Sequence, residues 1–204
     1  MSFRLKIASL WLPEYILKKE LDKVARVTIE GFNDVLKQHA PERIGEIATK
    51  DKNLEGPIEE RRAAMAMAHN NRVKLLIDVL GYENAIKIGR EAMFKVGCKL
   101  GQEARQRLGV GNSFKDLELA AKILYKILGI DFKIENSDGK LFMKVNRCYL
   151  SKYYSSESCM VLSAADEGVV HGLNENMSMI FKERITAGAQ ECIACIYGNN
   201  GVKS

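Results

Sequence analysis

The sequence predicts an α+β protein, with a helical N-terminal region followed by an antiparallel sheet built as β-hairpin, helix, β-hairpin. The first observation behind this prediction is the spacing of apolar residues, which recur every three or four positions over most of the chain before residue 129. The second is that apolar and polar residues alternate from Ile130 onward, as in strands with one buried face. The third is that two pairs of such alternating segments flank one further amphipathic helix.

Composition places the chain among ordinary globular proteins. Its 204 residues are 47% hydrophobic and 28% charged, which is too apolar for an intrinsically disordered chain. The net charge is +5, but Lys and Arg stand beside Glu and Asp along the helical segments, as at residues 18–20 and 59–62. A nucleic-acid surface would instead gather its basic residues on one face. We therefore expect no nucleic-acid partner.

The first helical segment extends from about residue 10 to residue 37. Its apolar side chains recur at helical spacing, and Pro41 ends the pattern. These apolar positions are too many for a lone exposed helix, so the segment should pack on the rest of the protein or on a second copy. A homodimer formed through the N-terminal helices is the second of these two expectations. Residues 50–57 are rich in charged and turn-forming residues and should form an exposed connection.

Three further helices are expected before the sheet. The second covers about residues 58–79 and ends at Gly81, because glycine commonly follows the last helical residue. The third covers about residues 83–108. The fourth begins after Ser113, a favourable N-cap residue, and continues to Gly129.

The first predicted hairpin occupies residues 130–145. Its two alternating segments are joined by a turn that contains Asp138-Gly139, a strong hairpin signal. The following helix should cover residues 155–173, with a serine as its N-cap and Gly172 as its stop. This helix is expected to lie across one face of the sheet.

The second predicted hairpin joins residues 177–185 to residues 192–197 around Gly188. Cys192 and Cys195 are three positions apart on its last strand, so their side chains should point to opposite faces. We expect Cys192 to face the helix, together with the apolar residues that share its side of the strand. This arrangement differs from a zinc knuckle, in which both thiolates lie on one side of a turn.

These patterns divide the chain into a helical N-terminal region at residues 1–79, an α+β domain at residues 80–198 and a polar tail at residues 199–204. No stretch approaches the roughly 20 apolar residues of a membrane span. The most apolar stretch near the start, residues 7–17, is interrupted by Pro13 and carries no signal-peptide cleavage pattern. The five cysteines are irregularly spaced and odd in number, which favours free thiols or ligands over disulfides. We expect a cytoplasmic protein with no membrane span.

The cysteines concentrate in the α+β domain. Cys148 ends the second strand, Cys159 lies early in the helix and Cys192 lies in the last strand, so the three can converge where the helix crosses the sheet. Asp166 follows Cys159 by seven positions and therefore lies on the same stripe of the helix. Three thiols and a carboxylate suit zinc or iron, or a thiolate nucleophile with an adjacent acid–base group.

Two other interpretations of the cysteines stay open at this point. Free cysteine is among the most buried residue types and packs like a small hydrophobic side chain, so all three can be core residues. The remaining interpretation is redox pairing between two of the thiols.

Several short motifs follow one another in a characteristic order between about residues 80 and 197. They are Gly89-Arg90, Gly97, Gly101, Asp116-Leu117, Leu128-Gly129, the run Phe142 to Cys148, Cys159 with Asp166, Gly172-Leu173-Asn174, the run Arg184 to Gly188, and Cys192. In this order the chain resembles the L-2-amino-thiazoline-4-carboxylate hydrolase family, which is similar to the vinyl-reductase-type ligand-binding domains (bacteriochlorophyll 4-vinyl reductase-like). The chain departs from the family pattern at Ala189 and at Ile193-Ala194, where family members usually carry Asp and Asp-Phe.

The resemblance implies a hydrolase that acts on a carbon–nitrogen bond of a small thiazoline-like ring, in a cysteine-rich pocket. Cys148, Cys159 and Cys192 would be the thiolates or, with zinc or iron, the metal ligands, and Asp166 would be an acid–base group. Arg147 would hold a substrate carboxylate through its bidentate guanidinium. The alternative function is a non-enzymatic sensor or carrier in which the same pocket binds a small molecule or a metal.

Overall fold

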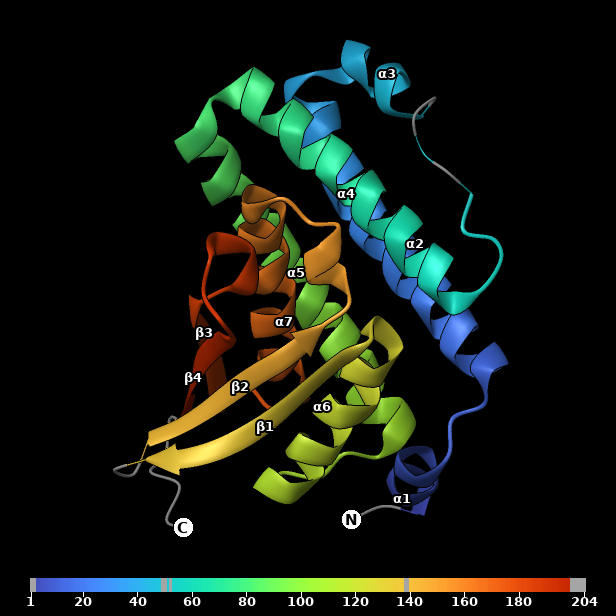
Figure 1. Cartoon of the computed structure of the whole chain (residues 1–204), viewed down its shortest axis with the longest axis vertical. Coiled ribbons are helices and arrows are strands. Elements are labelled where there is room, and N and C mark those ends of the chain that lie inside the picture. Colours follow the sequence, from blue (N-terminus) through green and yellow to red (C-terminus); the bar gives the residue numbers. More distant parts are fainter. Residues whose placement is uncertain (1–2, 49–50, 52, 138–139, 199–204) are drawn as a thin grey trace.

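Helices form the first two-thirds of the molecule and a four-stranded sheet follows them, as Figure 1 shows. The structure, a computed structural model, describes residues 3–48, 51, 53–137 and 140–198. Its elements in chain order are α1 (Phe3–Leu10), α2 (Glu14–His39), the 3-10 helix η1 (Pro41–Arg43), α3 (Ile44–Ala48), α4 (Ile58–Leu80), α5 (Tyr82–Leu108), α6 (Phe114–Leu128), β1 (Ile130–Ser137), β2 (Lys140–Cys148), η2 (Leu150–Lys152), α7 (Ser156–Leu173), β3 (Met177–Glu183), η3 (Ile185–Ala187) and β4 (Cys192–Gly198).

The predicted ends of α4, α5 and α6 are confirmed. Gly81, Gly109 and Gly129 follow these helices with φ angles of 73°, 64° and 71°, which glycine adopts at little cost. At the start of α6, the Ser113 hydroxyl accepts a hydrogen bond from the Asp116 N–H at 3.2 Å. Local capping chemistry therefore determines where these helices begin and end.

The first predicted helix is divided in the structure. α1 ends at Leu10 and α2 begins at Glu14, with Pro13 as its N-cap residue. A proline cannot donate the backbone hydrogen bond that a continuous helix needs, and it disfavours helical geometry at the residue before it. Of the predicted connection at residues 50–57, residues 50 and 52 lie outside the described part, and the others form no regular element.

The four strands form one antiparallel sheet in the order β1-β2-β4-β3, which confirms the predicted pair of hairpins. The central contact joins β2 to β4, with Val145 opposite Cys192. Cys192 and Ala194 are buried whereas Cys195 is partly exposed, as expected for alternating strand positions. The predicted turn at residues 138–139 lies outside the described residues.

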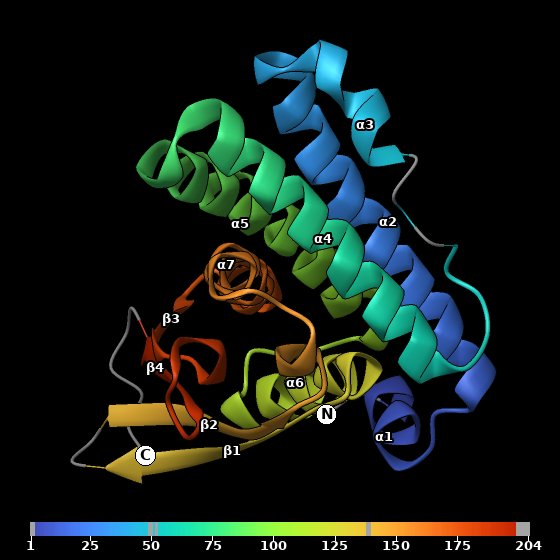
Figure 2. The same ribbon diagram turned by 45° about the horizontal axis from the view of Figure 1, so that its top comes forward.

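Helix α7 lies between the sheet and α5, as Figure 2 shows. The backbones of α5 and α7 approach each other closely through glycines on both helices. A Cβ at Gly97 would lie 2.0 Å from the Ala165 carbonyl oxygen, and one at Gly172 would lie 2.2 Å from the Cys98 carbonyl oxygen. Gly172 was predicted to end α7, but the helix continues to Leu173 and Asn174 is its C-cap. Gly172 serves helix packing because only a residue without a side chain fits between the two backbones.

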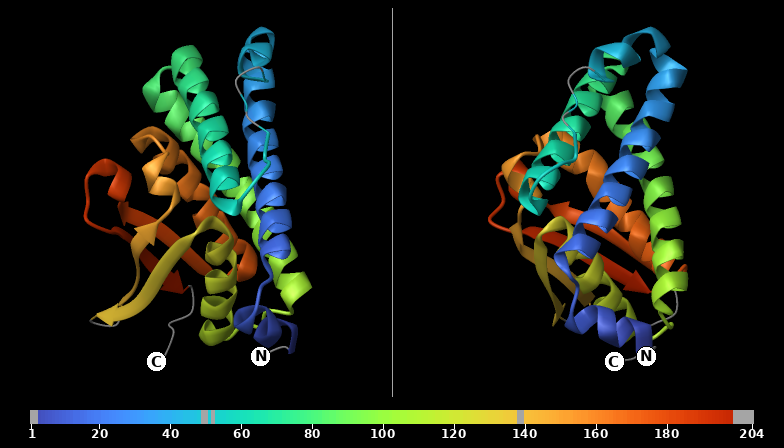
Figure 3. Two further views of the ribbon diagram at one scale, coloured as in Figure 1. Left: turned by 45° about the vertical axis from the view of Figure 1, so that its right-hand side comes forward. Right: turned by 90° about the vertical axis from the view of Figure 1, so that its right-hand side faces the viewer.

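Helices α2 and α4 run side by side and pack against α5, as both views in Figure 3 show. Their side chains enter the same hydrophobic cluster as those of the sheet: Leu21 of α2 and Met65 of α4 share it with Phe132, Met143 and Val145. The N-terminal helices thus pack on the α+β part of the chain, as predicted. Side chains from both sides of residue 80 occupy this cluster. The division of the chain into two regions at this residue stays a prediction. The predicted tail at residues 199–204 lies outside the described residues.

In the part of the chain that the structure describes, no helix combines the length and the apolar character needed to cross a bilayer.

Candidate functional site

A cavity of about 300 Å³ lies beside α7, between this helix, the sheet and helices α1, α2, α5 and α6. Small-molecule pockets in proteins have volumes of roughly 300–1,000 Å³, so this space can hold a ligand of modest size. Along α7 the lining residues recur at helical spacing, which gives one continuous stripe: Cys159, Leu162, Asp166, Val169, Val170 and Leu173.

One end of the cavity gathers most of the predicted site residues. Cys148 reaches it from the end of β2, Cys159 and Asp166 from α7, and Cys192 from the start of β4. We call this part, together with Arg184, the thiol end. None of the three cysteines is in a disulfide. Their convergence follows from the short connection η2, which returns the chain from β2 to α7, and from the pairing of β4 with β2.

Burial keeps the three thiols protonated at neutral pH. It raises the pKa of Cys148 to about 12, although backbone N–H groups of Leu150 and Ser151 favour its thiolate. Burial likewise raises the pKa of Cys159 and of Cys192. The opposing influences differ between them: the Thr186 hydroxyl and Arg184 favour the Cys159 thiolate, while the Ile185 N–H donates to the Cys192 sulfur at 3.3 Å. No opposing group outweighs burial in any of the three.

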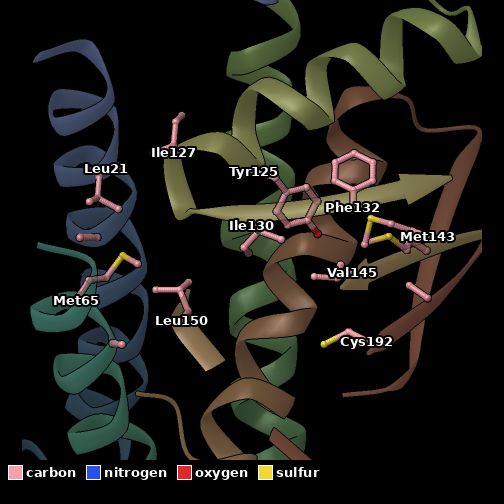
Figure 4. Packing of buried hydrophobic residues seen from close by; sticks show 14 of the residues in the cluster. Leu21, Met65, Tyr125, Ile127, Ile130, Phe132, Met143, Val145, Leu150 and Cys192 are labelled. Atoms are coloured by element: carbon pink, nitrogen blue, oxygen red, sulfur yellow. The ribbon is translucent and has the colours of Figure 1, made fainter. Parts of the chain in front are cut away.

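Asp166 is the titratable carboxyl of the thiol end. Burial raises its pKa from 3.8 to about 7, and the neighbouring Glu167 acts in the same direction. The Tyr125 hydroxyl, which favours the ionised form, lies nearby. This hydroxyl is buried and makes no hydrogen bond within the described residues, and Figure 4 shows it directed from α6 toward Val145. A carboxyl with a pKa near neutrality can both donate and accept a proton under physiological conditions.

Arg184 contributes the positive charge of the thiol end. Its guanidinium donates from Nε and Nη2 to the Ser163 hydroxyl at 3.2 and 2.9 Å. Ser163 also accepts from Arg90, whose Nη2 forms a 2.7 Å ion pair with the buried Glu167. The Phe181 N–H donates to the other oxygen of that carboxylate at 3.3 Å. These hydrogen bonds hold Arg184 in place between β3 and α7.

Arg147, predicted to bind a substrate carboxylate, lies away from the cavity. Its side chain is 79% exposed, and its nearest charged partner is Asp131 across the β1–β2 pair, at 3.8 Å. Arg147 directly precedes Cys148 on β2, so the two side chains point to opposite faces of the sheet. Arg184 lines the cavity instead. It is part of the motif at residues 184–188, for which the sequence predicted no role of this arginine.

A buried histidine next to the thiol end also escaped prediction. His69 of α4 contacts the Thr28 hydroxyl through Nε2 and the Tyr154 hydroxyl through Nδ1, each at 2.8 Å. Burial lowers the pKa of His69 to about 3, so the ring is neutral. A lone histidine among Ala and Met residues carries no local pattern of partners, because Thr28 and Tyr154 come from distant parts of the chain.

The predicted zinc or iron centre is not formed by the side chains as they are placed. Among residues 3–48, 51, 53–137 and 140–198, no group of three or more His, Cys, Asp or Glu side chains has an arrangement that could hold a metal ion.

Two solved structures share the fold at low sequence identity. A trafficking protein particle complex subunit 3 from Naegleria fowleri, covalently bound to palmitic acid, aligns with a TM-score of 0.56 and 15% identity over 72% of this chain and 99% of its own. An H-NOX protein from S. oneidensis in the Fe(II)NO ligation state aligns with a TM-score of 0.51 and 11% identity over 85% of this chain and 98% of its own. No curated protein matches the sequence.

The family comparison covers a larger and more specific part of the chain. Residues 60–196, about two-thirds of the sequence, match the family model of L-2-amino-thiazoline-4-carboxylic acid hydrolase. The match spans α4 to β4 and includes every residue of the thiol end. The chain therefore belongs to the L-2-amino-thiazoline-4-carboxylic acid hydrolase family.

Proposed function

We propose that the protein hydrolyses a small thiazoline-like ring at the thiol end of the cavity. The observation that carries this proposal is the presence, in one cavity, of three free thiols, a carboxyl that titrates near neutrality and a half-buried arginine. Hydrolysis of such a ring needs a nucleophile for the carbon between sulfur and nitrogen, an acid for the leaving atom and a group that orients the substrate. Each of these roles has a candidate in this set.

Cys159 is the proposed nucleophile. Its thiolate is favoured by the Thr186 hydroxyl and by Arg184, and transfer of the thiol proton to the substrate during attack avoids a free buried thiolate. The sulfur adds to the ring carbon while the thiol proton passes to the ring nitrogen. The pKa of Cys148 is raised to about 12, which makes it a poorer nucleophile. Its assigned role is to pack against the substrate.

Asp166 is the proposed general acid and base. It lies seven positions after Cys159, about 10.5 Å along α7, so a five-membered ring can lie between the two groups. The protonated carboxyl donates to the leaving ring nitrogen as the ring carbon–nitrogen bond breaks. The resulting carboxylate then takes one proton from a water molecule whose oxygen adds to the carbon bound to Cys159. As the carbonyl of the product forms, the carbon–sulfur bond to Cys159 breaks, and the remaining hydroxyl proton passes to the sulfur and restores the thiol.

Arg184 is the proposed partner of a substrate carboxylate. Its Nη1 makes no hydrogen bond to the described residues, whereas Nε and Nη2 are fixed by Ser163. Cys192, which borders Arg184 and receives the Ile185 N–H, would complete the wall opposite Cys159. Arg184 replaces Arg147 in this role because Arg147 faces solvent on the other side of the sheet.

Turnover of L-2-amino-thiazoline-4-carboxylate by the purified protein tests the proposal. Cys159→Ser and Asp166→Asn should each lower kcat by about 10²-fold or more, the usual contribution of a nucleophile or an acid–base group. Cys195→Ser is the matched control, because Cys195 is a free thiol of the same sheet outside the cavity wall, and it should keep wild-type turnover. For the wild type, kcat should fall above about pH 7 as Asp166 loses its proton. Unchanged turnover in Cys159→Ser would contradict the assigned nucleophile.

A non-enzymatic binding module is the second candidate function. It is favoured by the raised pKa values of all three thiols, which disfavour the nucleophilic thiolate form. The two structural neighbours also carry ligands, palmitic acid in one and nitric oxide on iron in the other. A bound small molecule that the protein releases chemically unchanged, without turnover of any thiazoline, would support this function over hydrolysis.

A homodimer through the N-terminal helices and the division at residue 80 belong to the proposal as well. Large apolar side chains are exposed on α1, in the connection that follows it and at the start of α2, including Leu10 at 83% and Trp11 at 70%. Side chains of this kind gathered on one surface commonly mark a contact with another chain. The helical region at residues 1–79 would then supply the dimer contact, and residues 80–198 would supply the thiol end.

A further inference from the structure

The cavity extends well beyond the thiol end. Past Asp166, its wall is mainly aliphatic, with side chains from α1 and the segment after it, α2, α5, α6 and the last turn of α7; the ion pairs Glu20–Arg107 and Lys23–Glu103 line it on the side of α2 and α5. We call this part the apolar arm; its wall includes Leu12, Leu17, Leu100, Ala104, Leu124 and Leu173. A small polar ring bound at the thiol end would not reach this arm. A ligand that fills the arm must therefore differ from such a ring in size and polarity.

The cavity is long and narrow, and the apolar arm takes about half of its length along α7. The stripe of α7 that lines the cavity extends from Cys159 to Leu173, fourteen positions or about 21 Å at 1.5 Å per residue. A total volume of about 300 Å³ along that length leaves room for one extended chain and excludes a broad fused-ring molecule. A mainly aliphatic wall offers few hydrogen-bond partners, so the part of the ligand that it surrounds must be largely apolar.

A polar head can be recognised where the apolar arm meets the thiol end. The Tyr125 hydroxyl is buried there and makes no hydrogen bond within the described residues. A buried hydroxyl without a partner costs about 1–3 kcal/mol, and an oxygen on a ligand would remove that cost. Arg184, whose Nη1 makes no hydrogen bond to the described residues, adds a positive charge on the same side.

From these observations we propose that the cavity binds a single-chain anionic amphiphile, with its aliphatic chain in the apolar arm and its head between Tyr125 and Arg184. The mainly aliphatic wall suits the chain of such a molecule, and the length of the cavity suits its extended form. The buried Tyr125 hydroxyl suits its polar head. The binding does not depend on hydrolysis, and a carboxylate with an unbranched chain has the required chemistry.

The ligand would enter between α2 and α5. Two ion pairs join these helices where they line the cavity: Arg107 holds Glu20 through two hydrogen bonds of 2.9 and 2.6 Å, and Lys23 pairs with Glu103. Arg107 and Glu103 are more than half exposed, so this side of the cavity lies next to solvent. In each pair the other partner, Glu20 or Lys23, is mostly buried, but solvent at the exposed partner screens the ion pair and lets it open at modest cost.

Displacement of the fluorescent fatty acid cis-parinarate from the full-length protein at pH 6 measures the predicted binding. Saturated fatty acids from octanoate to hexadecanoate should displace it, with affinity rising up to about fourfold for each added methylene group that becomes fully buried. The rise should stop once the chain exceeds the length of the apolar arm. Cholate, an anionic amphiphile with a broad ring system, should not displace the probe. Affinity that is independent of chain length, or displacement by cholate, would overturn the proposal.

Ala104→Trp should fill the apolar arm and weaken fatty-acid binding at least tenfold, whereas Lys99→Trp, at an exposed position of the same helix, should leave it unchanged. Tyr125→Phe provides a variant that keeps the fold. It removes a buried hydroxyl that makes no hydrogen bond of ordinary geometry within the described residues and that acts on Asp166 mainly in its ionised form. At pH 6, thermal stability should therefore change little while affinity falls about three- to tenfold. Wild-type affinity in both Ala104→Trp and Tyr125→Phe would show that the amphiphile binds elsewhere.

Cys159→Ser separates this inference from the proposed hydrolase. The variant should lose turnover but keep fatty-acid binding, because Cys159 lies at the far end of the stripe from Leu173. Turnover of the thiazoline without fatty-acid binding would overturn only the inference. Fatty-acid binding without turnover would overturn only the hydrolase.

Discussion

At the scale of single residues, the fold raises the pKa of the Asp166 carboxyl and thereby makes the stability of the protein depend on pH. The pKa of Asp166 is about 7 in the folded protein, against 3.8 for the free side chain. Between these values the folded protein binds one more proton at this site than the unfolded chain does. The contribution of Asp166 to stability is therefore fully present below about pH 4 and is lost as the pH rises through 7.

Asp166→Asn isolates this effect, because an amide has nearly the same shape and no charge to lose. The free energy of unfolding of the wild type, relative to that of Asp166→Asn, should fall by about 1.4 kcal/mol per pH unit between about pH 4 and pH 7. Urea denaturation of both proteins at several pH values measures this difference. A difference that does not vary with pH would mean that Asp166 is ionised in the folded protein as it is in the unfolded one.

The ion pair between Arg90 of α5 and Glu167 of α7 stabilises the packing of α7 beside the thiol end. The Glu167 side chain is only 8% exposed, so its charge depends on Arg90 at 2.7 Å. Arg90→Met should destabilise the protein by about 3–5 kcal/mol, because it leaves a buried carboxylate without its partner. The double variant Arg90→Met with Glu167→Gln should recover part of this loss, as chemical denaturation would show.

Lys122→Met gives the matched control for that ion pair. Lys122 pairs with Glu118 at 2.6 Å on the surface of α6, where half of the lysine side chain is exposed. Loss of this pair should cost less than about 1 kcal/mol. Equal losses in Lys122→Met and Arg90→Met would contradict the role assigned to burial.

At the scale of secondary-structure elements, the cavity depends on how closely α5 and α7 pack. Gly97, Gly101, Gly168 and Gly172 bring the two backbones together, and the opposite stripe of α7 is thereby turned toward the thiol end. A larger residue at any of these positions would push α7 toward the sheet. The same glycines that hold the helix pair together thus set the width of the cavity.

Gly97→Ala should destabilise the protein by about 3 kcal/mol, at the upper end for overpacking, because its Cβ would lie 2.0 Å from the Ala165 carbonyl oxygen. Gly45→Ala is the control: no atom lies within 4 Å of its Cβ position, and alanine should stabilise α3 by about 0.5–1 kcal/mol. Thermal or urea unfolding of both variants provides the measurement. Similar stability changes in the two would show that α5 and α7 can separate without cost.

At the scale of the whole molecule, the predicted homodimer rests on the apolar surface of α1 and the start of α2. Light scattering after size exclusion should give twice the mass of one 22.9 kDa chain. Trp11→Glu should shift the protein to the monomer, because it places a charge on a side chain that is 70% exposed in one copy. Ile180→Glu, at an exposed apolar position on β3, should leave the dimer intact. A wild-type monomer at every concentration would contradict the prediction.

The local part of the candidate site was readable from the sequence. Helical periodicity alone places Cys159 and Asp166 on one stripe of α7, and strand periodicity alone separates Cys192 from Cys195. Capping residues likewise marked the start of α6 and the ends of three helices. These features depend on neighbours within a few positions along the chain, and such neighbours are present in the sequence itself.

The tertiary structure alone decided which of these stripes and faces meet. The pairing of β2 with β4 brings Cys148 and Cys192 together, and the packing of α6 brings Tyr125 to Asp166. Arg184, rather than Arg147, reaches the cavity because its surroundings come from β3, α7 and α5. Contacts of this kind join residues far apart in the chain, and their choice depends on the packing of whole faces. The sequence by itself therefore determined the elements, the family and the residue types of the thiol end, while folding determined the cavity and its long apolar arm.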